Sequence, residues 1–452
     1  MNRSLMTVPL LLLCAWISPT SPMAEPGPIT LRACIEKALP YAEDIRLAEE
    51  SLYAAEQDRL RARSVLIPTV ELTGRLDGSD TEIQGAYAPP NQIEETRYGT
   101  FAGLGFQYSF YLNGRELIVY KASGELVEKA AMDLTAARHD YILQVAVTFV
   151  GVIRSEKGVA IADANLTRLI SNRDAVVRRI QAGLLTRTEQ FRSDAEVAGG
   201  RAELKEALNQ RIVNRRALQR LVPLPDDFQL EPPEKIPAPS DLSLEECVAL
   251  ATQNRPELKS LVIASSVADK EVAVAKSTYW PKLTLEGSAG RTDSRVDGSY
   301  DDLEVDFDLD TTRYTASLTL SLPLVDGGLR RADVRKSLSD KRSVDYRLAR
   351  KTKEIRLAVE RAWYDHNTES LRVRALEESL TFARQFLDSV TRRFDEGLAE
   401  SLDLIDANTR FVEAENQLAD ARFALQLAAI RLRYTSGVPM LPVPASQSAP
   451  NG

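Results

Sequence analysis

Carboxylates are the side chains of this sequence whose grouping could do chemistry. The densest group lies near position 300 and consists of Asp301, Asp302, Glu304, Asp306, Asp308 and Asp310. Carboxylate oxygens bind Ca²⁺, but this run lacks the glycine at the sixth position and the closing glutamate of a calcium-binding loop. We therefore interpret positions 293–310 as a solvated acidic surface loop rather than a cation site.

Histidine and cysteine, the other residue types that often carry catalysis or bind metals, are scarce. The chain has two histidines and three cysteines among 452 residues, which argues against histidine-rich metal sites and four-cysteine zinc modules. His139 and His366 lie in long helical patterns without a nucleophile–base arrangement, so we expect surface or packing roles for them. We expect no enzyme activity, no metal and no cofactor.

Cys34 and Cys247 occupy equivalent positions of an internal repeat, in which TLRACIEKA is matched by SLEECVALA. A disulfide between them is one interpretation for an oxidising compartment. However, equivalent positions of two repeats are more often apart than adjacent, and cysteine is a common small buried hydrophobic residue. Burial as free thiols is therefore the preferred interpretation.

The N-terminal segment indicates export. Residues 1–24 combine Arg3 with an apolar stretch from Leu5 to Ile17 and predict a secretory signal peptide. No later stretch has the roughly 18 consecutive apolar residues of a membrane helix, so a membrane-spanning part would have to be a β-barrel. The net charge of −8 gives no electrostatic reason to expect nucleic acid as a partner.

The chain repeats a helix–strand–strand–long helix–helix unit. The first copy covers 25–221, a proline-rich linker follows over 222–240, and the second copy covers 241–437. The final residues, 438–452, predict a disordered tail. Matching residues of the two copies differ by 213 positions: Cys34 and Cys247, Pro68 and Pro281, Leu72 and Leu285, Gly74 and Gly287.

Each copy contains two segments that alternate apolar residues with polar or small ones. These predicted strands lie at about 68–77, 96–112, 281–291 and 312–325. Alternation over about ten residues is typical of membrane-barrel strands, and the smallest bacterial barrels have about eight of them. Four strands are therefore too few for one chain, whereas three copies would supply a twelve-stranded barrel.

Each copy also ends in a long helical hairpin. Heptad spacing is clearest in the second, where the seam reads Leu404, Ala407, Phe411, Ala414, Leu418, Ala421, Leu425, Ala428 and Leu432. The hairpins turn at Gly183 and Gly397, where glycine allows a tight reversal, and a leucine follows each glycine. Polar faces beside the seams favour a hollow helical barrel over a solid bundle.

This order of features resembles the TolC family of outer-membrane channel proteins. The resemblance is carried by the paired helix openings, the proline before each first strand, the run SLPLVDGGLRRA at 321–332 and the two hairpin turns. It implies a mainly α protein with a membrane β-barrel: a trimer whose twelve-stranded barrel, with four strands per chain, lies in outer-membrane lipid. An α-helical barrel would continue it into the periplasm.

The resemblance also implies a function and partners. Such a channel is the passive exit duct of a tripartite efflux or type I secretion system, docked on a periplasmic adaptor (a membrane fusion protein) and an inner-membrane transporter. Adaptor contact is expected at Gly183, Leu184, Gly397 and Leu398. The alternative is an exported coiled-coil structural or adaptor protein without a pore, although an adaptor would have one helical hairpin flanked by soluble β-domains.

In that family, carboxylates shortly after the hairpin glycine ring the periplasmic entrance. Asp403 and Asp406 match these positions, and Glu189 lies six residues after Gly183 as Asp403 lies six after Gly397. The resemblance therefore implies a periplasmic gate of these three carboxylates. The alternative is that they are first-turn carboxylates that interact favourably with the helix dipole.

One departure from the family pattern concerns the latch of that gate. Ala399 stands where some members carry a basic latch residue. A closed-state latch would then be built differently, with Arg187, Arg392 or Arg393 as candidates.

Overall fold

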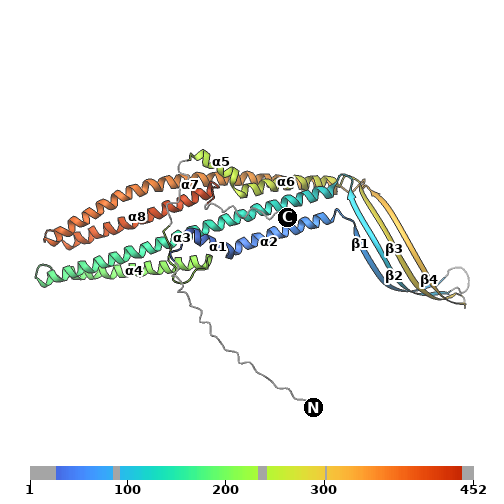
Figure 1. The fold of residues 1–452 in the computed structure, drawn as a ribbon, viewed down its shortest axis with the longest axis horizontal. Coiled ribbons are helices and arrows are strands. Elements are labelled where there is room, and N and C mark those ends of the chain that lie inside the picture. The colour runs from blue at the N-terminus through green and yellow to red at the C-terminus, as the bar shows by residue number, and fades with distance from the viewer. Residues whose placement is uncertain (1–26, 85–91, 233–241, 301–302, 440–452) are drawn as a thin grey trace, which may run out of the picture.

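The computed structural model describes residues 27–84, 92–232, 242–300 and 303–439. The predicted signal peptide, the second half of the predicted linker and nearly all of the predicted tail lie outside these ranges. Within them the molecule is an elongated body with helices at one end and a single sheet at the other (Figure 1). The two hairpin tips lie at the end opposite the sheet.

Two sets of elements follow one another in the same order. The first set is α1 (Leu31–Ala38), the short helix η1 (Leu39–Tyr41), α2 (Glu43–Ser64), β1 (Thr69–Gln84), β2 (Gln92–Tyr111), α3 (Arg115–Gln181) and α4 (Arg187–Leu221). The second set is α5 (Leu244–Asn254), α6 (Pro256–Ser277), β3 (Lys282–Tyr300), β4 (Leu303–Ser321), α7 (Leu329–Asp395) and α8 (Ser401–Thr435). The long arms match in length, because α3 and α7 each have 67 residues and α4 and α8 each have 35.

The largest hydrophobic cluster lies where α1, α3 and α4 meet. Phe149 and Val145 of α3 and Leu218 of α4 are fully buried there. The first part of the predicted linker belongs to the same cluster, since Phe228 is buried in it and Leu230 forms a parallel bridge with Ile29. The described part of the linker therefore packs on the first repeat through Val222, Leu224, Phe228 and Leu230.

The two cysteines of the repeats are free and buried. Cys34 lies in the cluster of α1, α3 and α4, whereas Cys247 lies in a separate cluster with residues of α6 and α7. Burial raises the pKa of the Cys34 thiol to about 11. The preferred interpretation of buried free thiols is confirmed, and the disulfide alternative is wrong.

The four strands form one antiparallel sheet in the order β1-β2-β3-β4. They are longer than predicted, with 16, 20, 19 and 19 residues. The prediction of an acidic loop over 293–310 is wrong, because all of it except the undescribed positions 301–302 belongs to β3 and β4. The run LEVDFDLD at 303–310 has the period of a strand, and its high charge hid that period.

Of the helices in the described part of the chain, none is both long and apolar enough to cross a membrane.

Candidate functional site

The two hairpin tips have the same backbone geometry. At the first tip, Gly183 has φ 79° and donates its N–H to the Ile180 carbonyl at 2.9 Å, and Leu184 donates to the Arg179 carbonyl at 2.9 Å. This pair of bonds closes a helix end in the Schellman motif, whose left-handed residue favours glycine.

The second tip repeats this arrangement. Gly397 has φ 78° and donates to the Phe394 carbonyl at 3.0 Å, and Leu398 donates to the Arg393 carbonyl at 2.7 Å. The leucine that follows each glycine is exposed, to 73% for Leu184 and 65% for Leu398. In many Schellman motifs this residue packs back on its own helix. Here it leaves an apolar side chain at each tip that a partner could cover.

The predicted gate carboxylates lie just beyond these tips, Glu189 on α4 and the two aspartates on α8. Asp403 accepts a hydrogen bond from the Glu400 backbone N–H at 3.1 Å and so helps to cap α8. Asp406 forms an ion pair with Arg410 at 3.1 Å, and Glu189 forms one with Arg192 at 3.4 Å. Within one chain, each carboxylate therefore interacts with its own helix, and only across copies could they form a ring.

Two of the three candidate latch residues, Arg392 and Arg393, contact their own hairpin as well. Arg392 donates to the Asp388 carbonyl at 3.2 Å, and Arg393 donates to the Leu398 carbonyl at 3.3 Å. A contact between the hairpins comes instead from Arg179 of α3, which lies 3.7 Å from Asp395 of α7.

A polar cluster that sequence reasoning missed joins α3 to α8. Asn408 donates to the Asn165 side-chain carbonyl at 3.0 Å, and both residues are buried. Arg168 lies 5.0 Å from the ring centre of Phe411 and 4.0 Å from Glu415. Burial lowers the pKa of Arg168, and Glu415 opposes that shift. The sequence signal for this cluster was Asn408, which lies next to Ala407 in the otherwise apolar heptad seam of α8.

A second missed cluster lies at the junction of α5 and α6. Arg255 is buried, donates to Glu257 at 3.0 Å and to the Tyr434 carbonyl of α8 at 3.2 Å, and lies over the Tyr434 ring. Tyr434 in turn donates its hydroxyl to Asp140 of α3. Burial disfavours the charged form of the neighbouring His139 and so lowers its pKa. Glu257 and Asp140 oppose this shift, and Arg255 adds to it.

The sheet has two chemically different faces. One face carries apolar side chains on all four strands, in strand order Val70, Leu72, Leu104, Phe106, Leu285, Leu318 and Leu320, and every one of them is at least 40% exposed in the single chain. The register places them together, for example Leu72 opposite Leu104 and Leu285 opposite Leu318. An exposed apolar surface of this extent is suited to lipid.

The apolar part of this face lies towards the helical end of the strands. On β2 it runs from Leu104 to Phe110, which is six residues or about 20 Å along a strand. Further out, the same face of β2 lies opposite charged residues of β3, with Ala102 opposite Arg291 and Tyr98 opposite Arg295. The apolar rows are therefore suited to lipid, and the charged rows beyond them are suited to water and headgroups.

The opposite face is polar at the same level. Gln107 donates to Glu286 at 2.9 Å, Ser109 and Thr284 share a hydrogen bond of 3.1 Å, and Ser288 and Thr315 share one of 2.6 Å. Polar side chains that bridge neighbouring strands in this way are suited to a water-filled interior.

A family model described as outer membrane efflux protein matches residues 34–222 and 247–438, which is most of the chain. The chain belongs to the outer membrane efflux protein family. The alkaline protease secretion protein AprF of Pseudomonas aeruginosa is 26% identical over 66% of this chain, and the match spans 62% of AprF, less than two thirds of its length. An outer membrane protein TolC from Salmonella enteritidis is 21% identical over 89% of this chain and 82% of its own.

Solved structures with this fold are also outer-membrane proteins. The outer-membrane channel OprN aligns over 91% of both chains with a TM-score of 0.76 at 19% identity. The outer membrane protein VceC from Vibrio cholerae aligns over 91% of this chain and 97% of its own, with a TM-score of 0.76 at 17% identity. The fold class predicted from the sequence is confirmed.

The predicted function is confirmed at the level of the family. The efflux protein is an outer-membrane channel of an efflux or secretion system, located in the outer membrane with a periplasmic helical portion. The alternative of an exported coiled-coil adaptor without a pore does not fit, because the match covers both strand pairs as well as both hairpins.

Proposed function

We propose that three copies of this efflux protein close a twelve-stranded barrel and form a passive exit duct without catalytic chemistry. The observation that carries this proposal is the open four-stranded sheet. Its edge strands, β1 and β4, each pair with one neighbour in the described part of the chain. A long edge strand offers unpaired N–H and C=O groups, and inside a bilayer these groups must be satisfied. Pairing β1 of one copy with β4 of the next satisfies them.

The duct would continue through the helices into the periplasm. At about 1.5 Å per residue, α3 and α7 would each be about 100 Å long, and they extend from the sheet end towards the tips. The polar face of the sheet would line the outer-membrane segment of the duct, and the apolar face would contact lipid. Residues 25–221 and 241–437 would act as two similar halves of each copy.

The tips are the proposed docking points for a periplasmic adaptor and, through it, an inner-membrane transporter. The support is the exposed apolar side chain held at each turn, Leu184 and Leu398, beside a glycine whose conformation keeps the turn tight. Glu189, Asp403 and Asp406 would form the periplasmic gate. In a trimer each of them occurs three times around one axis, and a ring of carboxylates favours cations.

Native mass measurement of the full-length protein in detergent, followed by planar-bilayer recording of the same sample, tests the proposal. We expect a trimer that conducts ions. A protein that remains monomeric in several detergents, or a trimer that never conducts, would contradict it.

A further inference from the structure

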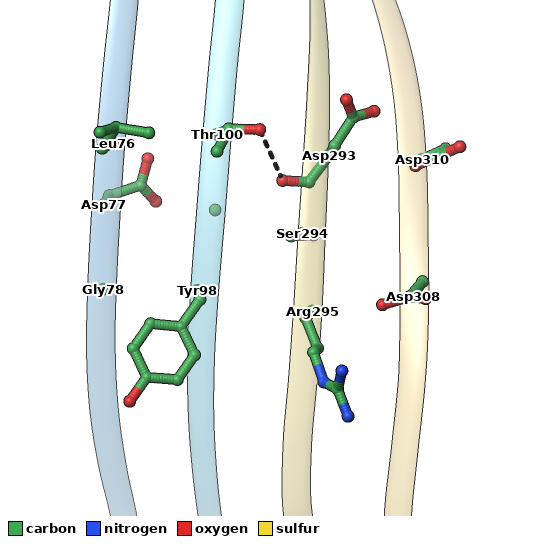
Figure 2. Close-up of a pocket in the computed structure, with 11 residues that line it drawn as sticks. Leu76, Asp77, Gly78, Tyr98, Thr100, Asp293, Ser294, Arg295, Asp308 and Asp310 are labelled. Carbon is green, nitrogen blue, oxygen red and sulfur yellow. Dashed lines mark hydrogen bonds between the residues drawn. The ribbon is translucent and has the colours of Figure 1, made fainter.

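The lipid-facing side of the sheet carries a hollow of about 720 Å³ beyond its apolar rows. Each residue whose side chain lines it lies an even number of positions from the apolar residues of its own strand, so the hollow opens towards lipid rather than towards the duct. Figure 2 shows the two rows that line it: Leu76, Thr100, Asp293 and Asp310 in one, and Gly78, Tyr98, Arg295 and Asp308 in the next.

The hollow lies at the depth of the lipid headgroups. A lipid-facing band about 25 Å high requires about ten residues of a strand tilted by about 40°. Counted from Phe110 at the helical end of β2, this length ends at Thr100, in the first row of the hollow. The charge of Arg291, one row before the hollow, is paired with Asp293 and Asp310 within it. Since the helices lie on the periplasmic side, this depth belongs to the outer leaflet.

An exposed aromatic ring forms one wall of the hollow. Tyr98 is 61% exposed, and its ring lies over Gly78 of β1, 3.6 Å from the position that a Cβ atom would occupy there. In the row before it, Thr100 donates its hydroxyl to the Asp293 backbone carbonyl, 3.4 Å away (Figure 2). An open aromatic ring beside a few polar groups is a usual lining of a small-ligand site, and the apolar face of a sugar ring stacks on such a ring.

The opposite wall supplies hydrogen-bonding groups. Arg295 donates to Asp297 and Asp306, which uses two of the five N–H donors of its guanidinium. Asp308 lies opposite Arg295 in the register but forms neither an ion pair nor a hydrogen bond with any described residue. Donors and acceptors are therefore both left for a ligand in the hollow.

The charge of the lining selects among the groups of a lipid headgroup. Three carboxylates, those of Asp293, Asp308 and Asp310, accompany the one guanidinium of Arg295, so the net charge is negative and disfavours a phosphate. Hydroxyl groups donate to carboxylates and accept from guanidinium groups, so a neutral sugar suits both kinds of side chain. The outer leaflet of a bacterial outer membrane consists largely of glycolipid, whose headgroup is a saccharide.

We propose that the hollow binds the saccharide headgroup of an outer-leaflet glycolipid. Tyr98 stacks on one sugar ring, Asp308 accepts hydrogen bonds from its hydroxyl groups, and Arg295 donates to its oxygen atoms. The acyl chains of the same lipid extend past Leu76 to the apolar rows around Leu104, which adjoin the hollow on the same face. The inference rests on the proposed barrel, in which this face is the outer one.

The test titrates the assembled trimer with a defined glycolipid. The full-length protein is assembled in detergent, lipid A (a phosphorylated diglucosamine glycolipid) is added, and native mass spectrometry counts the bound molecules per trimer. Tyr98→Leu removes the aromatic face and should weaken binding about two- to ten-fold, whereas Tyr98→Trp should retain it. Asp308→Asn removes a charged acceptor and should weaken binding about ten-fold or more.

Two variants on the same face are matched controls and should bind like the unsubstituted protein. Tyr314→Leu removes an exposed tyrosine from the apolar rows, and Glu304→Gln removes a carboxylate beyond the hollow. Lipid A without its phosphates should still bind, and phosphatidylethanolamine should not displace it.

The inference would be overturned if Tyr98→Leu and Asp308→Asn bound lipid A as the controls do. Loss of binding on removal of the phosphates, or equal binding of phosphatidylethanolamine, would overturn it as well, because the hollow would then recognise a phosphate or an ammonium group. The same spectra count the chains of each particle, so a protein that never forms a trimer would contradict the proposed function instead.

Discussion

Replacing Leu104 by arginine tests which face of the sheet meets lipid. Leu104 lies on the apolar face between Leu72 and Ala289, with Arg291 one row further out. An arginine on a barrel's lipid face costs up to about 2–4 kcal/mol, the value at the bilayer midplane, so three copies would cost up to about 6–12 kcal/mol per trimer. The folding equilibrium constant of each chain would fall by up to about 30- to 900-fold.

Two control variants separate the effect of facing lipid from the effects of the added charge and of depth in the membrane. Gln107→Arg places the same charge on the opposite face, where Glu286 lies within hydrogen-bonding distance of position 107, so it should be tolerated. Thr96→Arg lies on the lipid side but beyond Tyr98, next to Asp80, and should cost about 0–1 kcal/mol.

The assay is the yield of assembled trimer in the outer membrane, together with urea titration of refolding into lipid vesicles. Leu104→Arg should lose most of its trimer, while the other two variants should retain it. If Gln107→Arg were the damaging variant and Leu104→Arg assembled normally, the assignment of the two faces would be reversed.

Three further predictions concern the helical part. Gly397→Val would place a branched side chain at φ 78° and distort the tip, so efflux should fall while the yield of trimer is kept. Gly199→Val, on an open helix surface, is the control. Full efflux by the Gly397→Val variant would refute the docking role of the tip. Asp403→Asn with Asp406→Asn should lower cation selectivity and remove block by a trivalent cation in bilayer recordings, and unchanged selectivity would leave the aspartates as helix-capping residues. The pKa of His139 is lowered in the folded protein, so the stability that this residue contributes is present above its ordinary pKa and is lost as pH falls through the pKa of the folded state. The melting temperature should therefore be lower at pH 5 than at pH 8. His139→Gln should weaken that pH dependence.

The helical part was largely predictable from the sequence, because its signals are local. Heptad spacing located α8, and the glycines at 183 and 397 located both tips, whose left-handed conformation few other residues adopt readily. The contacts between the hairpins were not predictable in this way. Asn165 and Asn408 are 243 positions apart, and nothing in the local pattern of either pairs it with the other.

The sheet was predicted in number and alternation but not in extent. On β4 the predicted strand stops where the apolar residues pass from one face to the other, because the prediction followed apolar residues on a single face. Beyond that point the period of two continues with the faces exchanged, as Phe307 and Asp308 show. The alternation of side chains with a period of two would by itself have predicted the rest of β3 and β4. The high charge of that stretch led to the prediction of a loop instead.

The equal lengths of the two hairpins constrain how this protein can change over evolution. Inserting one residue into α7 would displace everything beyond it by about 1.5 Å and rotate it by about 100°, turning the heptad seam away from its neighbour. A seven-residue insertion restores the facing of the seam, at about 10.5 Å per heptad, but only if the returning arm gains the same length. The tips of the two halves stay level only if both hairpins change together, so viable length variants should differ by whole heptads in four helical arms at once.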